Sequence, residues 1–432
     1  MTALLDPAPS VPGVAAGPAR DTRLAEWLVV TVLAVVIANN VPTTTPMAVT
    51  LLAPALGLYG LVLARRMGGL ARTGALGLVV LLMVVLPAYD GIDGMATGTP
   101  TYGHDGGVHQ TRRAGELLLT GRDPYTASYA DVLARVPVTV DRAIVANPVT
   151  ERYSYEPLTI LVQLPVQAPL RALGERGDPR FVYLAVYLAL FAFLCRWSLR
   201  ARGDLLLPAV LLLNPVLVTF LWLGVTDVLL LAGLAVAAWA LAARRAVAAG
   251  LALGLALATK LLLAPVAVVF AAWVAGRAAA GLLPVRTAVR TGIALAAPAL
   301  VCALPFLLWH PGAFLGDVLW YHLGLTPDRY PIVGSGLPAL LVDLDVITDR
   351  LDPAPVWSTL LPSLAAAAVA CRVAWRRHDP AGFLLTAGGC FLAAVYFSRY
   401  FMATYWQVPM ALAALALLVP FDRLERHDDL KP

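Results

Sequence analysis

Two residues stand out for the chemistry that they could perform. Asp105 lies in a loop among Gly103, Gly106 and Gly107, and glycines let the backbone and a ligand approach each other closely. A carboxylate in such a loop is suited to act as a general base. Lys260 lies between two short apolar segments, where a cation is costly unless it has an anionic partner. The two residues would suit proton abstraction next to a bound anionic group.

Each carboxylate near Asp105 also has a purely structural interpretation. Asp105 itself can form an Asx-turn or cap a helix that begins at Val108. Asp90 and Asp93 compete with it for the role of base, and their alternative is an ordinary polar end of an apolar segment. Asp123 precedes a proline, which is typical of a residue that caps a turn. We therefore expect Asp105 to be the base, with Asp90 and Asp93 as the competing pair.

The cationic residues have alternatives as well. Lys260 would bind a phosphate or form an internal ion pair with Asp227. Asp227 begins an apolar segment, so it either caps that helix at its positive N-terminus or binds a polar group of a substrate. Arg399 lies amid Tyr396 and Tyr400, so it is either a second phosphate ligand or a side chain that reaches the interface within an aromatic belt.

The composition indicates a polytopic membrane protein. Of the 432 residues, 59% are hydrophobic and 14% are charged, whereas soluble domains are about 45–50% apolar and about 25% charged. The formal charge of +5 comes from basic residues scattered between apolar segments, which indicates a charge bias across a membrane rather than nucleic-acid binding. The four cysteines lie inside apolar segments and show no CxxC or CxxH spacing, so neither a disulfide framework nor a zinc site is indicated.

The apolar segments predict an all-α fold with about twelve transmembrane helices. The expected spans are 25–39, 47–64, 73–89, 181–196, 204–222, 226–243, 246–259, 261–276, 290–309, 356–371, 381–397 and 405–420. The pair 246–259 and 261–276 is short for a bilayer core, so it forms either a buried hairpin or one long tilted helix. A further apolar segment, 157–170, contains three prolines and is interpreted as a re-entrant or interfacial helix.

The basic residues predict the orientation. With both termini in the cytoplasm, the cytoplasmic loops and tails together collect more than half of the 32 Lys and Arg residues, as the positive-inside rule requires. Residues 1–24 and 421–432 are then cytoplasmic tails, the first of them disordered, around a membrane domain at 25–420. Two large segments, 90–180 and 310–355, lie on the extracytoplasmic side. We expect the chemistry on that face.

The first outer segment contains an expected amphipathic helix at 108–120. Val108, Ala114 and Leu117 have helical spacing, opposite a polar face that includes Gln110 and Glu116. This pattern favours a helix that lies on the outer leaflet. The second outer segment is rich in aromatic residues, which suit sugar stacking but are also typical of interface anchors.

Several motifs occur in a characteristic order along the chain. They are Asp105, LLLTGRDPY at 117–125, YSYEPL at 153–158, LNPVLVTFLWLGVTD at 213–227, ATKLLLAP at 258–265 and, less clearly, FSRYFMATYWQVP at 397–409. In this order they resemble the polyprenyl-phosphate-sugar-dependent glycosyltransferases of the GT-C fold, most closely glycosyltransferase family 87, the mannosyltransferase-like membrane proteins of actinobacteria. The sequence departs from the family pattern at His109, at Glu156 and at Gly224–Asp227, which puts the sugar and the acceptor in doubt more than the reaction.

The resemblance implies transfer of a sugar, with mannose or arabinose expected, from a polyprenyl-phosphate donor to a glycolipid or glycan acceptor. It implies inversion at the anomeric carbon, with no cofactor and no metal. The donor phosphate would be bound by Lys260, Arg399 and His322. The sugar or the acceptor would be bound by His109, Tyr125, Tyr155, Glu156, Asp227 and Tyr330.

A transporter or flippase for a lipid-linked or small polar substrate is the alternative function. Such proteins usually contain internal repeats and ionisable residues at the middle of the bilayer. The sequence shows no clear repeat between its halves, and its polar residues concentrate at the outer boundary. The short hairpin around Lys260 is the one feature that would suit a transporter. A non-catalytic membrane scaffold is a third possibility if Asp105 proves dispensable.

Overall fold

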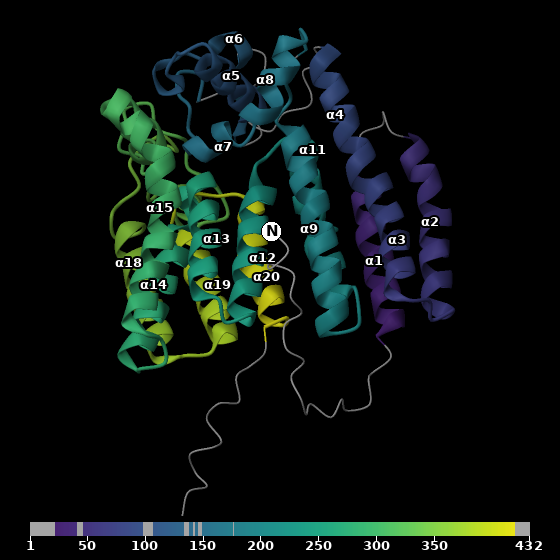
Figure 1. The fold of residues 1–432 in the computed structure, drawn as a ribbon. Coiled ribbons are helices and arrows are strands. Elements are labelled where there is room, and N and C mark those ends of the chain that lie inside the picture. Colours follow the sequence, from purple (N-terminus) through teal and green to yellow (C-terminus); the bar gives the residue numbers. More distant parts are fainter. Residues whose placement is uncertain are drawn as a thin grey trace, which may run out of the picture.

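The computed structural model describes residues 22–40, 46–97, 107–133, 138–140, 143–145, 149–175 and 177–419. Long helices form a bundle, and a layer of short helices, α5 to α8, lies across one end of it (Figure 1). We call this end of the molecule the layered end. The described chain begins and ends at the opposite end (Figure 1). Nearly all of the two predicted tails, and Asp105, lie outside the described residues.

The bundle contains most of the helical residues. Its first part consists of α1 (Arg23–Ala38), α2 (Pro46–Ala64), α3 (Gly69–Val80), η2 (Leu81–Val85), α4 (Leu86–Thr97), α9 (Arg180–Ala201), α10 (Leu206–Leu212) and α11 (Pro215–Trp222). Its second part consists of α12 (Asp227–Ala242), α13 (Ala246–Thr259), η4 (Leu261–Leu263), α14 (Ala264–Ala279), α15 (Val285–Trp309), α18 (Leu360–Arg376), α19 (Pro380–Tyr396), η6 (Ala403–Trp406) and α20 (Gln407–Ala416).

The layered end is built from two separate parts of the chain. The first part contains α5 (Gly107–Leu119), η3 (Pro124–Thr126), α6 (Ala130–Leu133), β1 (Val138–Val140), β2 (Ala143–Val145), α7 (Pro157–Leu161) and α8 (Leu164–Ala172). The second contains α16 (Pro311–Leu315), η5 (Gly316–Trp320), β3 (Val333–Gly334), α17 (Leu337–Asp343) and β4 (Tyr400–Phe401). Strands β1 and β2 pair antiparallel, and β3 pairs parallel with β4. The second pairing attaches the outer segment to the end of α19.

Each of the twelve expected spans contains a helix, but not every one is long enough to cross a bilayer. In the described ranges, four helices are long and apolar enough by themselves, and these are Gly69–Gly94, Arg180–Ala201, Leu261–Ala279 and Val285–Trp309. Segment 157–170 forms two short helices, α7 and α8, rather than one span. The helical membrane architecture is therefore as predicted, while twelve crossings stay a prediction.

The span expected at 204–222 is broken into α10 and α11. The side chain of Asn214 accepts a hydrogen bond from the backbone N–H of Val216 at 2.9 Å, which caps α11. Pro215 has no N–H to continue a helix from α10. A new helix therefore begins at this Asn-Pro pair.

Close packing of small residues positions the end of α13. A Cβ atom at Gly254 would lie 2.4 Å from the carbonyl oxygen of Leu295, and one at Gly250 would lie 2.6 Å from that of Thr291. Only glycine allows α13 and α15 to approach this closely. At the layered end, the hydroxyl of Thr159 in α7 donates to the carbonyl of Thr259 at 3.3 Å. These contacts position the turn that carries Lys260.

Helix α5 corrects one part of the amphipathic prediction. Gln110, expected on the polar face, is fully buried. Its amide nitrogen donates to the carbonyls of Val149 and Arg152 at 2.8 and 2.7 Å. The helix is therefore packed between α7, α8 and the loop before α7, and does not lie alone on a surface. The local pattern did not reveal this because the partners of Gln110 come from a distant part of the chain.

Candidate active site

A cavity of about 460 Å³ lies at the layered end of the bundle. Its walls come from the loop before α7, the turn between α13 and α14, the region after η5 and the chain from α19 to η6. Five of the predicted site residues line it, and these are Tyr155, Glu156, Lys260, His322 and Tyr330. Ser154, Tyr400, Thr404 and Tyr405 also line it, although sequence reasoning did not assign them. The structure thus brings together residues that are more than 250 positions apart in the chain.

Lys260 and Asp227 form an ion pair at this cavity. The Lys260 Nζ atom lies 2.5 Å from Asp227 Oδ1, and the ammonium lies 5.8 Å from the centre of the Tyr405 ring. Both side chains are largely buried. The other oxygen of Asp227, Oδ2, is buried and has no hydrogen-bond partner among the described residues. Lys260 therefore contributes an ammonium group to the cavity lining, and Asp227 Oδ2 is an acceptor that the described residues leave unused.

Glu156 reaches the same turn from the opposite wall. It precedes Pro157 at the start of α7, and its Oε1 accepts a hydrogen bond from the backbone N–H of Leu261. Burial raises the pKa of this carboxyl to about 7, although the hydrogen bond and the positive charge of Lys260 act in the opposite direction. Glu156 is therefore able to gain or lose a proton near neutral pH.

His322 is held as a neutral ring. Its Nε2 lies 2.8 Å from the carbonyl oxygen of Ser154, which can only accept, so Nε2 carries the proton. Its Nδ1 then accepts a hydrogen bond from the hydroxyl of Tyr400. Burial lowers the pKa of His322, and Lys260 acts in the same direction. Both nitrogens are thus occupied, and the ring carries no charge for a phosphate.

Tyrosine rings form one wall of the cavity. The ring centres of Tyr330 and Tyr400 are 5.6 Å apart, and those of Tyr400 and Tyr405 are 6.1 Å apart. Burial raises the pKa of Tyr400, so its hydroxyl stays protonated at neutral pH. Such a wall can stack against the apolar face of a sugar ring and offer hydroxyl groups to its oxygens.

Two predicted site residues lie behind this wall. The buried guanidinium of Arg399 donates to the carbonyls of Tyr330, Asp352 and Arg350 at 2.7, 2.6 and 2.9 Å. Tyr125 donates its hydroxyl to the carbonyl of Tyr155 at 2.9 Å. Neither residue is among those that line the cavity. Both instead hold cavity residues in position.

The beginning of α5 packs close to the cavity. The side chain of Val108 would be only 2.6 Å from a Cβ atom at Gly224, which has a φ of +77°. The next residue, Val225, lines the cavity. His109 is half-buried, does not line the cavity, and has an Nε2 atom without a partner in the described part of the chain. Burial, followed by the charges of Arg112 and Arg180, lowers its pKa. Asp105 precedes this helix but lies outside the described residues.

An ion-pair cluster that sequence reasoning missed joins the two outer segments. Arg152 Nη1 lies 3.0 Å from Asp317, and Arg152 Nε lies 2.8 Å from Asp328. Asp317 also accepts from the backbone N–H of Tyr153 at 3.0 Å. Burial raises the pKa of Asp317 to about 7, although the backbone N–H of Tyr153 and the charge of Arg152 act in the opposite direction. The only sequence signal was a carboxylate in an otherwise apolar aromatic stretch.

A second missed residue is fully buried Arg180 at the start of α9. It pairs with Asp178 at 2.7 Å and donates to the carbonyls of Gly91 and Trp222 at 2.6 and 2.9 Å. It therefore links α4, α9 and α11 at the layered end. The Asp-x-Arg spacing at a helix start was the signal available for this pair.

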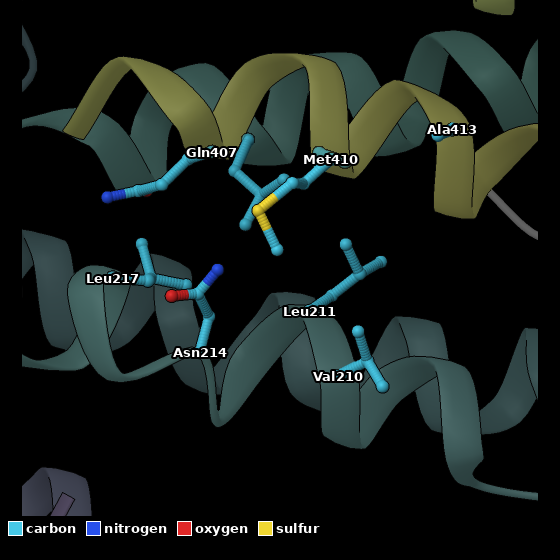
Figure 2. A pocket seen from close by; sticks show the side chains of 9 residues that line it. Val210, Leu211, Asn214, Leu217, Gln407, Met410 and Ala413 are labelled. Carbon is cyan, nitrogen blue, oxygen red and sulfur yellow. The ribbon is translucent and has the colours of Figure 1, made fainter. Parts of the chain in front are cut away.

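An apolar pocket of about 230 Å³ lies deeper in the bundle, between α10, α11, α12 and α20. Figure 2 shows the side chains of Leu211, Leu217 and Met410 around it. Gln407 also lines it, and both polar atoms of its side-chain amide are buried without a partner among the described residues. A narrow space lined by Asp227 and Gln407 lies between this pocket and the main cavity, and it shares residues with each.

The arrangement combines a cation, two carboxylates and an aromatic wall with a nearby apolar pocket. Lys260 can offset charge that develops on a departing phosphate. The tyrosine wall can contact a sugar ring, Asp227 lines the narrow space beside this cavity, and burial raises the pKa of Glu156 to about 7. The apolar pocket lies beyond the narrow space that is lined by Asp227 and Gln407.

Comparisons with known proteins give the family. No curated protein and no solved structure shows a significant match to the chain. The family model of glycosyltransferase family 87 matches residues 153–398, a range that includes Glu156, Asp227, Lys260 and His322. The match confirms the resemblance predicted from the motifs. Because it covers more than half of the sequence, the chain belongs to glycosyltransferase family 87.

Proposed function

We propose that the cavity at Lys260 transfers a sugar from a polyprenyl-phosphate donor to a glycolipid or glycan acceptor. The observation that carries this proposal is the position of the Lys260–Asp227 pair, between a tyrosine-lined cavity and an apolar pocket within the bundle. A lipid-linked phosphosugar needs these three environments next to one another. Family membership supports sugar transfer. Mannose or arabinose is the sugar that we propose.

The proposed reaction is a single displacement. A hydroxyl oxygen of the acceptor attacks the anomeric carbon, and the bond from that carbon to the phosphate oxygen breaks. The phosphate oxygen takes the electron pair, and Lys260 stabilises the added negative charge. Asp105 accepts the proton of the hydroxyl as general base. One displacement inverts the anomeric configuration.

We assign the remaining residues to binding and positioning. Asp227 Oδ2 would accept from a sugar hydroxyl, while Tyr155 and Tyr330 would contact the sugar or the acceptor. Because His322 is neutral and both its nitrogens are occupied, we assign it to holding Tyr400 rather than to binding phosphate. Arg399 and Tyr125 would act through the cavity residues that they support, and His109 is not among the residues that line the cavity.

The proposed site faces the extracytoplasmic side. Arg244 and Arg245 join α12 to α13 at the end of α13 opposite Thr259, and Thr259 contacts the outer layer. Turns rich in arginine favour the cytoplasmic side of a membrane. This separation supports an orientation with both termini in the cytoplasm and the layered end outside.

The function predicts a defined donor requirement. The purified protein in lipid nanodiscs should transfer sugar from a polyprenyl-phosphate sugar and release polyprenyl phosphate, but it should not use a nucleotide sugar. The reason is that the apolar pocket can bury an isoprenoid tail, at about 25 cal/mol per Å². Mass spectrometry of both products measures this. Uptake of a lipid-linked sugar across vesicles without any transfer would instead identify a transporter.

A pair of variants tests the route of the tail. Ala413→Trp should fill the apolar pocket from its exposed edge and raise the KM of a long-chain donor about tenfold, equivalent to about 1.4 kcal/mol. A short-chain donor should be unaffected. The matched control is Leu417→Trp. It adds the same side chain at a nearby exposed position that does not line the pocket. Equal effects on both donors would contradict this route.

The orientation is tested by labelling single cysteines on intact cells. A cysteine at Thr126 or Asp343 should react with a membrane-impermeant thiol reagent, because both positions lie at the layered end. A cysteine at Arg245 should react only after permeabilisation. The four native cysteines would first be replaced by alanine. The reverse pattern would overturn the assignment of the site to the outer face.

A further inference from the structure

We propose that Glu156 binds the donor phosphate in its protonated form, and that its ionised form competes with the phosphate for the same positive groups. This inference rests on the proposed donor site at Lys260. Glu156 is also one of the positions at which the sequence departs from the motif pattern described above. Glu156 would therefore make donor binding by this chain depend on pH.

The positions of three adjacent groups carry the inference. The carboxylate of Glu156 lines the cavity and accepts from the backbone N–H of Leu261. Leu261 follows Lys260 directly and begins a continuous helix, Leu261–Ala279, whose N-terminus is electropositive. An anionic side chain of the protein thus lies where a phosphate could interact with both the ammonium and the helix end. Two anions would repel each other there.

Several other charged and titratable groups surround Glu156. Asp227, on α12, is held in its ion pair with Lys260. His322, after η5, is neutral because burial lowers its pKa. The nearby tyrosines stay protonated because burial raises their pKa values, and these are Tyr125, Tyr153 and Tyr400. Burial raises the pKa of Glu156 itself to about 7, so its charge changes near neutral pH.

The direction of the pH dependence follows from the charge of Glu156. Burial raises its pKa to about 7, so below this pH the group is neutral and can donate a hydrogen bond to the phosphate. Above this pH its negative charge opposes the phosphate, and binding requires the uptake of one proton. Donor affinity should therefore be highest below pH 7 and fall by up to about tenfold per pH unit above it.

The test compares wild type with Glu156→Gln. The glutamine keeps an oxygen that accepts from Leu261, and its amide can donate to a phosphate without ever carrying a charge. The probe is a polyprenyl methyl phosphate, a diester whose single charge is constant over the tested pH range. Its affinity is measured by calorimetry in nanodiscs. We expect affinity for wild type to fall with increasing pH and affinity for Glu156→Gln to stay constant, so that the variant binds more tightly than wild type at alkaline pH.

A second measurement keeps the inference testable if the variant does not fold. Calorimetry of wild type in buffers of different ionisation enthalpy should show uptake of about one proton per bound diester above pH 7. Asp317→Asn is the matched control, because Asp317 has a similar pKa but lies outside the cavity lining. We expect this variant to keep the pH dependence of wild type.

The outcomes separate this inference from the function on which it rests. Binding of the diester without proton uptake, or weaker binding by Glu156→Gln at every pH, would overturn the role of Glu156 and leave the donor site intact. Loss of the pH dependence in Asp317→Asn would also overturn it. No binding of the diester to wild type at any pH would overturn the donor site itself.

Discussion

Asp105→Asn should leave a folded, membrane-inserted protein whose rate of sugar transfer falls by about 10²–10⁴-fold. Asparagine has nearly the same size as aspartate and keeps hydrogen-bonding capacity, but it cannot accept the proton of the acceptor hydroxyl. The adjacent helix α5 begins next to the turn at Gly224, and Val225 in that turn lines the cavity. Asp105 therefore lies only a few residues along the chain from Val108, the side chain that packs against this turn. Single-turnover rates at saturating donor measure the loss.

Three carboxylates provide the controls for this result. Asp90 and Asp93 lie in α4, and their asparagine variants should keep most of the activity. Glu156→Gln should change donor affinity and its pH dependence more than the turnover rate. Near-wild-type turnover by Asp105→Asn, together with loss of activity in one of the other three variants, would show that the base is that other residue.

Removal of the charge of Lys260 should mainly weaken binding of the donor. A hydrogen bond to a charged group contributes about 1.5–3 kcal/mol, so the KM of the polyprenyl-phosphate sugar should rise about 10–100-fold. The KM of the acceptor should change much less, because Lys260 is assigned to the phosphate. Lys260→Arg should restore only part of the affinity, since the planar guanidinium is larger and has a different geometry. Separate saturation curves for donor and acceptor measure both effects.

The ion pair with Asp227 determines the design of this experiment. Lys260→Ala alone leaves a buried carboxylate without its partner, which typically costs about 3–5 kcal/mol of stability. The double variant Lys260→Met with Asp227→Asn removes both charges, and we expect it to fold while still failing to bind the donor well. If the double variant kept wild-type donor affinity, the pair would be purely structural, and the phosphate site would have to be sought elsewhere.

Much of the architecture followed from local patterns in the sequence. Apolar segments long enough to form helices predicted a helical membrane protein, since unpaired backbone groups are not tolerated in a bilayer. The end of α5 was also predictable, because a glycine, Gly121, follows it in the sequence. In the structure this glycine has the positive φ of +73° that is typical of a helix end. The motifs around Glu156, Asp227 and Lys260 predicted the family. Each of these features depends on residues that are neighbours in the chain.

The candidate site was predicted only in part. Lys260 had two interpretations in the sequence, a phosphate ligand or the partner of Asp227, and the structure shows the ion pair while the phosphate remains a proposal. Arg399 was expected among phosphate ligands or interface anchors, but its guanidinium binds three backbone carbonyls. A side chain with five donors uses whichever acceptors the fold supplies, and these acceptors lie 47 to 69 residues away along the chain.

The sequence by itself determined the helical membrane architecture and the family, because hydrophobic length and short motifs are local properties. Only the tertiary structure decided which polar side chains share the cavity and which support it. Arg152 and Asp317 are 165 residues apart, and Glu156 contacts Leu261 across 105 residues. Such pairs form because burial in an apolar surrounding makes every unpaired polar group costly, so each group takes the partner that packing brings near. No local pattern carries that information.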